Sequence, residues 1–162
     1  RAEIDDDTVA EQRLILPVAP DPLTAFYPPL VRLVHGRPAP AAWNALSMAP
    51  HPHRLTRTSA RGFTLEVLGG EMMTTLFEGL LRPPSEPLYT GWTLDLPGYS
   101  VEVLEMGRAG PTRVAFTFRD NLDDPSIQLL VWRDGTLRPL APPAIGDSME
   151  IPHAWGVFGE LS

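Results

Sequence analysis

The second half of the chain alternates apolar and polar residues over short segments, which is the pattern of β-strands buried on one face. In Val114-Ala115-Phe116-Thr117-Phe118, for example, every second residue is large and apolar. Asp134-Gly135 lies between two such segments and is the pair most typical of a two-residue hairpin turn. The pattern predicts strands over Tyr89–Leu96, Tyr99–Met106, Thr112–Phe118, Ile127–Arg133, Thr136–Leu140 and Ser148–Ile151.

The first half contains fewer strand signals. His53–Thr58 and Phe63–Leu68 alternate on either side of Ser59-Ala60-Arg61-Gly62 and predict a hairpin. The apolar run Gln12–Ala19 predicts an earlier strand. Because Pro17 has no amide donor, we expect that strand to lie at a sheet edge or to break at this residue.

Two segments have helical spacing. Asp21-Pro22 is a favourable helix start, and apolar residues follow it at helical intervals as far as Gly36. Pro28-Pro29 interrupts them, which predicts a kinked helix or two short ones. The apolar residues of Met72–Leu81 lie on one face of a second short helix, which ends at Arg82-Pro83-Pro84.

These elements predict a β-dominated α+β fold, built as a small antiparallel β-barrel or sandwich with one or two short helices. The chain has 162 residues, of which 43% are hydrophobic, and this suffices for one domain. Residues 1–11 are acidic and predict a solvated N-terminal segment. We expect a single globular domain over 12–162, with a β-rich core at about 53–152.

One short pattern occurs twice. Gly91-Trp92-Thr93-Leu94-Asp95-Leu96-Pro97 and Gly146-Asp147-Ser148-Met149-Glu150-Ile151-Pro152 share the form Gly-x-x-apolar-x-apolar-Pro. In each, glycine permits a turn, alternation buries one face, and proline ends the hydrogen-bonded ladder. Two similar strands would explain the likeness, and so would a duplicated half-domain.

The composition excludes several classes of function. All 13 basic residues are arginine, and with 19 prolines this indicates the codon bias of a GC-rich genome. The formal net charge of −7 opposes binding to nucleic acid. The chain has no cysteine, so disulfides, thiol nucleophiles and thiolate metal sites are impossible. This composition suits an extracytoplasmic location and a cytoplasmic one equally.

No apolar run is long enough to cross a bilayer, so we expect no transmembrane segment in this chain. The chain starts at Arg1 rather than Met, from which we expect a leader, an anchor or a larger parent protein.

Two groups of residues have metal-ligand chemistry. His51 and His53 would lie on one side of an extended backbone, as in a transition-metal site. Asp120, Asp123 and Asp124 offer oxygen ligands in a short span, as calcium loops do. Each group also has an ordinary interpretation, as a polar loop before a strand and as a turn, and we favour it. We predict no bound cofactor.

No catalytic motif is present. The chain has no Gly-x-Ser-x-Gly, phosphate-binding loop or His-Glu-x-x-His sequence. The carboxylate pairs Glu66/Glu71 and Glu102/Glu105 could be nominated in any protein of this composition, and we expect Glu66 and Glu102 to face solvent beside arginine. A hydrolase that uses these carboxylates or the histidines is the alternative function, together with a small-ligand carrier that uses the β-interior.

The predicted helix at Met72–Leu81 has two interpretations. Its apolar face covers the β-structure, or it forms an adaptable docking surface for a membrane protein or peptide, because methionine side chains adapt to varied partners. We expect a protein partner or a membrane protein complex. The candidate partner-binding residues are Met72, Met73, Leu76, Phe77 and Leu80.

A set of turn and strand-edge sequences resembles a known group of proteins. These sequences include Leu96-Pro97-Gly98-Tyr99-Ser100, Asp123-Asp124-Pro125-Ser126 and Val131-Trp132-x-Asp134-Gly135. They resemble the soluble C-terminal regions of uncharacterised multi-pass membrane proteins of high-GC bacteria. The resemblance implies an extramembrane, periplasmic domain without assigned catalytic residues. We therefore expect a non-catalytic domain for protein–protein interaction or assembly in a bacterial membrane-associated protein.

Overall fold

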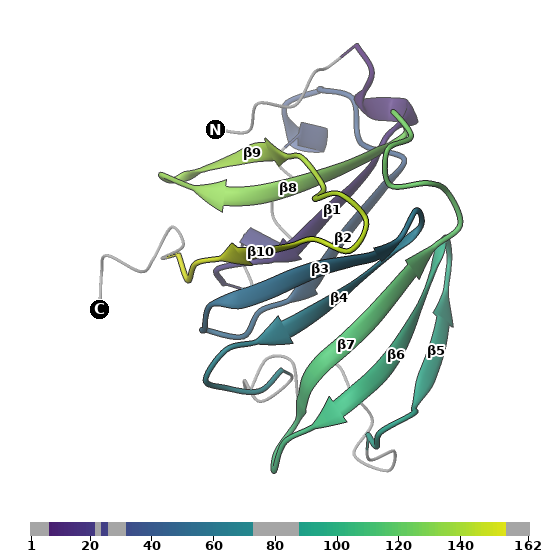
Figure 1. Ribbon diagram of the computed structural model, residues 1–162. Coiled ribbons are helices and arrows are strands. Elements are labelled where there is room, and N and C mark those ends of the chain that lie inside the picture. The colour runs from purple at the N-terminus through teal and green to yellow at the C-terminus, as the bar shows by residue number, and fades with distance from the viewer. Residues whose placement is uncertain (1–6, 22–23, 26–31, 73–87, 155–162) are drawn as a thin grey trace. The chain divides into compact units, whose positions relative to one another are not determined.

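Strands dominate the structure, a computed structural model that describes residues 7–21, 24–25, 32–72 and 88–154 (Figure 1). A short 3-10 helix, η1, spans Val9–Glu11. The strands are β1 Arg13–Val18, β2 Ala42–Ser47, β3 His53–Ser59, β4 Gly62–Val67, β5 Thr93–Leu96, β6 Tyr99–Met106, β7 Pro111–Phe118, β8 Ile127–Arg133, β9 Thr136–Leu140 and β10 Ser148–Ile151. The prediction of a β-dominated fold is confirmed.

The chain forms two compact units, each assembled from separate stretches of sequence. Unit 1 comprises residues 1–48, 123–141 and 154–162, and unit 2 comprises 49–122 and 142–153. Each unit contains one sheet, and within the described residues neither sheet closes into a barrel. The single domain over 12–162 stays a prediction.

The sheet of unit 1 has the strand order β2-β1-β8-β9. β1 runs parallel to both β2 and β8, whereas β8 and β9 form an antiparallel hairpin at Asp134-Gly135. We had expected antiparallel pairing, so the mixed sheet is a correction. The sequence of β1 is continuously apolar after Arg13. Such a sequence is typical of a strand in a parallel sheet, because that strand is buried on both faces.

β1 is a central strand, so of the two alternatives expected for Pro17 the edge position is wrong, whereas pairing is interrupted at this residue as the second alternative predicts. Its paired residues with β8 run only from Arg13 to Ile15. Pro17 lies beyond this ladder and next to β2, where it is fully buried. The missing amide donor is therefore accommodated by a local end of pairing rather than by an edge position.

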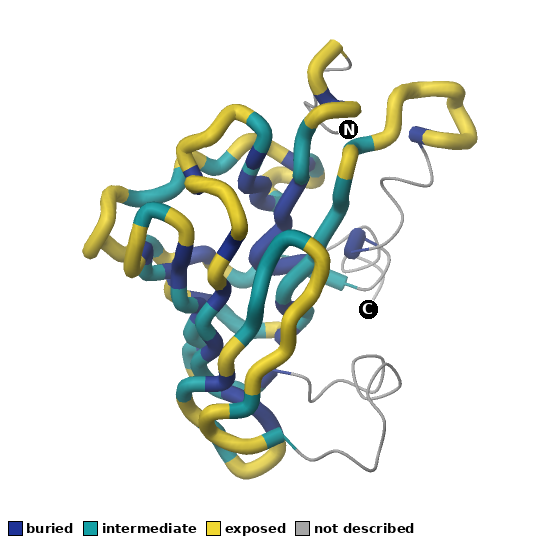
Figure 2. The backbone as a smooth tube through the Cα atoms, turned by 90° about the vertical axis from the view of Figure 1, so that its right-hand side faces the viewer, coloured by how far each residue is buried: buried dark blue, intermediate teal, exposed yellow. Residues whose placement is uncertain are grey.

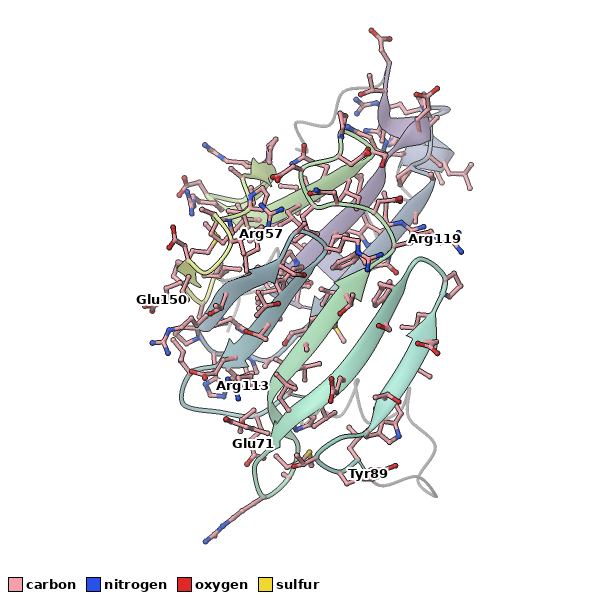
Figure 3. The ribbon with its side chains drawn as sticks, turned by 45° about the vertical axis from the view of Figure 1, so that its right-hand side comes forward. Arg57, Glu71, Tyr89, Arg113, Arg119 and Glu150 are labelled. Atoms are coloured by element: carbon pink, nitrogen blue, oxygen red, sulfur yellow. The ribbon has the colours of Figure 1, made fainter. Side chains whose placement is uncertain are left out.

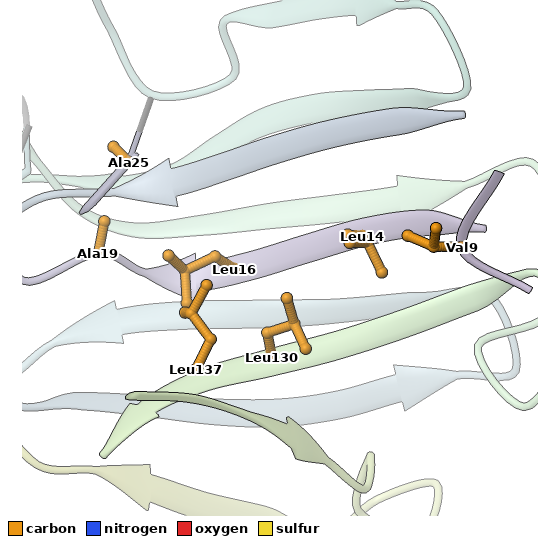
Figure 4. Close-up of a cluster of buried hydrophobic side chains, with 7 residues drawn as sticks. All are labelled: Val9, Leu14, Leu16, Ala19, Ala25, Leu130 and Leu137. Carbon is orange, nitrogen blue, oxygen red and sulfur yellow. The ribbon is translucent and has the colours of Figure 1, made fainter. Parts of the chain in front are cut away.

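One buried hydrophobic cluster of unit 1 lies on one face of this sheet (Figure 4). Val9 is fully buried there, although it belongs to the N-terminal segment that we expected to be solvated. Trp43 packs against the same cluster and donates its indole N–H to the carbonyl of Ala25. The buried cluster consists of Val9, Leu14, Leu16, Ala19, Ala25, Leu130 and Leu137.

The two ends of the first predicted helix are described, while its middle and the Pro28-Pro29 interruption lie outside the described residues. Asp21 caps the start, because its side chain accepts the amide of Thr24 at 2.7 Å. At the other end Gly36 has a φ of +66°, and Arg37 N–H donates to the carbonyl of Arg32. This is a Schellman C-cap, as the glycine predicted.

The sheet of unit 2 is antiparallel throughout, with the order β10-β3-β4-β7-β6-β5. One face is apolar and includes the stacked rings of Phe63, Phe118 and Tyr99. Buried positions lie mainly in the strands, and most loops and hairpin tips are exposed (Figure 2). The predicted β3–β4 hairpin is confirmed.

This sheet contains the same three-stranded arrangement twice. The pairs formed by β10, β3 and β4 match those formed by β5, β6 and β7, and the two halves meet at the pair Thr64–Ala115. In one half, Met149 pairs with Leu55, which pairs with Leu65. In the other half, the residues at the equivalent positions are Leu94, Val101 and Phe116, and they pair in the same order. The strand order and register are those of a duplicated half-sheet in which one edge strand follows later in the chain.

The two repeated sequence patterns form the two edge strands. Gly91 N–H donates to the carbonyl of Val103, and Val103 N–H donates back to Trp92. Gly146 and Asp147 make the same pair of bonds with Arg57. Since the glycines have φ values of +92° and +91°, each edge strand begins with a G1 β-bulge.

The bulge predicts a specific sensitivity at Gly146. A Cβ atom there would meet no other atom within 4 Å, so Gly146→Ala changes only backbone strain. We expect the free energy of unfolding to fall by about 1–2 kcal/mol, and Gly146→Asn to lose less, because asparagine tolerates positive φ better. Chemical denaturation measures both. Equal stability of Gly146→Ala and the unmodified chain would show that the bulge does not need glycine.

Candidate functional site

The two candidate metal-binding histidines lie in unit 2, where His53 is buried and His51 is half-buried. His53 is fully buried on β3, and its Nδ1 lies 2.8 Å from the carbonyl oxygen of His51. The ring of His51 packs on Gly70, where any side chain would clash with it. The pKa of His53 is lowered to about 4, chiefly by burial. The hydrogen bond with the His51 backbone opposes this lowering, and the nearby imidazoles of His51 and His153 add to it.

The acidic loop has the hydrogen bonds of an ordinary turn. Asp124 Oδ1 accepts the Ser126 amide at 2.8 Å, and this bond lowers the pKa of Asp124. Asn121 Oδ1 accepts a bond from the Arg57 guanidinium. In the part of the chain that the structure describes, no three His, Asp or Glu side chains, including those of Asp120 and Asp123, gather closely enough to hold a metal ion.

The candidate carboxylates take part in structural contacts. Glu71 accepts the backbone amides of Arg108 and Ala109 at 2.7 and 2.8 Å, so its side chain holds the β6–β7 loop (Figure 3). Gly107 makes room for it, because a Cβ atom there would clash with the carboxylate. The arrangement binds an anion, but the anion is the protein's own side chain.

The polar face of the unit 2 sheet carries a row of alternating charges. The guanidinium of Arg54 lies 3.1 Å from a carboxylate oxygen of Glu66, so this glutamate has the arginine partner that we expected. The guanidinium of Arg113 lies 2.9 Å from a carboxylate oxygen of Glu105. The cross-strand register continues the row to Glu150 at the β10 edge (Figure 3). Solvated pairs of this kind contribute little each, but the alternation avoids like charges on neighbouring strands.

Arg57 is a buried cation of unit 2. Its guanidinium donates to the carbonyls of Ser59, Ala60 and Pro143 as well as to Asn121, over distances of 3.1–3.3 Å. These acceptors come from three loops, so the side chain joins them beneath the sheet edge at β10. Its role is structural.

The predicted partner-binding helix lies almost wholly outside the described residues. Of its five candidates only Met72 is described: its side chain is buried and its amide donates to the carbonyl of Pro111. The docking role of Met73, Leu76, Phe77 and Leu80 stays a prediction.

A different surface of unit 2 exposes apolar side chains, at the edge strand β5. Leu94 is 41% exposed and Leu96 is 37% exposed, and Tyr89, just before the strand, is also exposed (Figure 3). On β10, the equivalent strand, Met149 is half-buried and Ile151 is only 6% exposed. As far as the described residues show, the same element is therefore buried at one sheet edge and exposed at the other. We call the exposed surface of Tyr89, Leu94 and Leu96 the β5 edge.

The sequence predicted this strand but not its position at an edge. The only signal was the repeated Gly-x-x-apolar-x-apolar-Pro pattern, whose terminal proline is typical of a strand that ends its ladder. Which edge remains uncovered depends on packing by distant segments, which a local pattern does not contain.

Among the described residues no helix combines the length and the apolar character needed to span a membrane. Comparison of the chain with protein-family models, curated proteins and solved structures finds no match.

Buried, neutral His53 predicts a pH dependence of stability. Because its folded pKa of about 4 lies below the ordinary 6.5, its contribution is complete above pH 6.5 and is lost as the pH falls towards 4. Between pH 7.5 and 4.5 this loss amounts to about 2–3 kcal/mol. In His53→Gln the fall in unfolding free energy over this range should be smaller by that amount, measured by urea denaturation.

His35→Gln is the matched control, because His35 is exposed, and it should keep the pH dependence of the unmodified chain. An unchanged pH dependence in His53→Gln would show that another group causes the acid sensitivity.

Proposed function

We propose that this chain is a non-catalytic binding or assembly domain that makes protein contacts through the β5 edge. The observation that carries the proposal is the exposure of Leu94 and Leu96 on a strand whose counterpart, β10, has its apolar residues covered. Exposed leucines on an edge strand favour aggregation unless a partner covers them. Their presence here is therefore best explained by a contact.

The other polar groups considered for chemistry support the same proposal through their structural contacts. His53 is buried and hydrogen bonded to backbone, Glu71 holds a loop, and Glu66 is paired with Arg54. Each contact gives its side chain a role in folding. The further proposal that the domain serves outside the cytoplasm, as part of a bacterial membrane-associated protein, rests on the sequence resemblance.

The double variant Leu94→Thr/Leu96→Thr tests whether these leucines serve contacts rather than folding. Threonine keeps a high strand propensity and removes apolar surface. We expect the free energy of unfolding, measured at low protein concentration, to fall by about 1 kcal/mol, since the leucines are only partly buried. Retention on a hydrophobic-interaction column should fall clearly.

Leu65→Thr is the control, because Leu65 lies on the same apolar sheet face but is fully buried. It should lose about 3 kcal/mol or more. A double variant as unstable as Leu65→Thr would assign the leucines to the core of the monomer and contradict the proposed function.

A further inference from the structure

We infer that the occupant of the β5 edge is a second copy of this chain, whose β5 pairs antiparallel with the first about a two-fold axis at Leu94. The inference rests on the proposed function and identifies the partner. It extends the six-stranded sheet of unit 2 across two chains, as in other cases of strand addition at a sheet edge.

The backbone of β5 is oriented for this pairing. Val103 N–H donates to the carbonyl of Trp92, so Trp92 directs its carbonyl towards β6. Backbone direction alternates along an antiparallel strand, and Thr93 and Asp95 therefore direct their N–H and C=O groups outward. Among the described residues no strand pairs with that outer side.

The side chains of β5 match one another in this register. With Leu94 opposite the partner's Leu94, Thr93 lies opposite the partner's Asp95 and forms a hydrogen-bonded backbone pair with it. Trp92 then lies opposite the partner's Leu96 on the apolar face. Two-fold symmetry repeats both contacts, giving four backbone hydrogen bonds and a continuous apolar strip.

The symmetric register centred one residue further along the chain, on Asp95, is unfavourable. Centring the pair on Asp95 would place two carboxylates directly opposite each other, which destabilises a strand pair. It would also place Thr93 opposite the partner's Pro97, which has no amide to donate. The sequence of β5 thus favours the arrangement centred on Leu94 over the one centred on Asp95.

The β10 edge provides an internal comparison. The equivalent pairing, centred on Met149, would place Asp147 opposite the partner's Ile151, a carboxylate against an apolar side chain. Ile151 is moreover already buried within the chain. The two edges have the same backbone, but only β5 has a self-complementary sequence.

The association should be weak and dependent on concentration. An interface of one short strand from each chain is smaller than those of stable complexes. Each chain also carries a net charge of −7, so the two copies repel each other at low ionic strength. Added salt screens this repulsion and should strengthen the dimer.

Single-cysteine variants test the register, since the natural chain has no cysteine. Opposite residues in a non-hydrogen-bonded antiparallel pair have Cα atoms about 4.5 Å apart, within the range of a disulfide. Under mild oxidation Leu94→Cys should form a covalent dimer, whereas Met149→Cys, at the equivalent position of β10, should stay monomeric. Ile145→Cys, at a site that is 59% exposed, controls for random collision and should also stay monomeric.

Sedimentation velocity tests the unmodified chain. Its average sedimentation coefficient should rise towards that of a dimer with increasing concentration, and rise further with added sodium chloride. Leu94→Lys, which places like charges at the axis, should remain monomeric, while Ile145→Lys should behave as the unmodified chain does.

The outcomes separate this inference from the proposed function. If the unmodified chain is monomeric throughout, or Ile145→Cys crosslinks as readily as Leu94→Cys, self-pairing is wrong. The contact role of the β5 edge still stands in that case, provided that Leu94→Thr/Leu96→Thr remains stable. If that double variant unfolds as readily as Leu65→Thr, the edge belongs to the monomer core and both ideas are wrong.

Discussion

A glycine held at a φ near +90° sets the register of each edge strand in unit 2. Gly91 and Gly146 adopt this conformation and begin a G1 bulge, which adds one residue opposite Val103 and Arg57 respectively. Side chains alternate along a strand, so a slip of one residue would move Leu94 and the other apolar residues to the polar face. The identity of every exposed and buried side chain on the two edges follows from these bulges.

Because the two halves of the unit 2 sheet share one arrangement, a difference between their edge strands indicates a difference in role. Two half-sheets with one register differ in what covers their edge strands: Ile151 of β10 is buried, and Leu96 of β5 is exposed. The halves also differ beside the bulge, where Arg57 joins three loops and its counterpart Val103 is an ordinary apolar residue. The β10 edge thus takes part in internal structure, and the proposed contacts involve the β5 edge.

Most of the strands could be predicted from the sequence, whereas their arrangement could not. β6, β8, β9 and β10 have the predicted bounds because alternation and the Asp134-Gly135 turn are local signals. β2 was missed because Ala42–Ser47 follows a proline-rich stretch and lacks a strong alternating pattern, and its pairing with β1 supplies the order. The edge position expected from Pro17 was wrong for the same reason, because contacts between distant residues set the strand order.

The candidate site shows the same limit. His51 and His53 are candidate metal ligands by residue type. Their environment depends on the fold, because the His51 ring packs on Gly70 and His53 is buried. The β5 edge carries no reactive residue type at all. Its proposed contact role rests on exposure, on outward backbone groups and on the way Trp92 and Leu96 would complement each other about Leu94.

Amide hydrogen exchange of β5 tests this account most directly. The Leu94 amide points towards β6 and should be protected at every protein concentration, whereas the amides of Thr93 and Asp95 point outward and should exchange rapidly in dilute solution. The account predicts that protection of Thr93 and Asp95 rises together as the concentration increases. Rapid exchange of both at all concentrations, or protection of both in dilute solution, would contradict it.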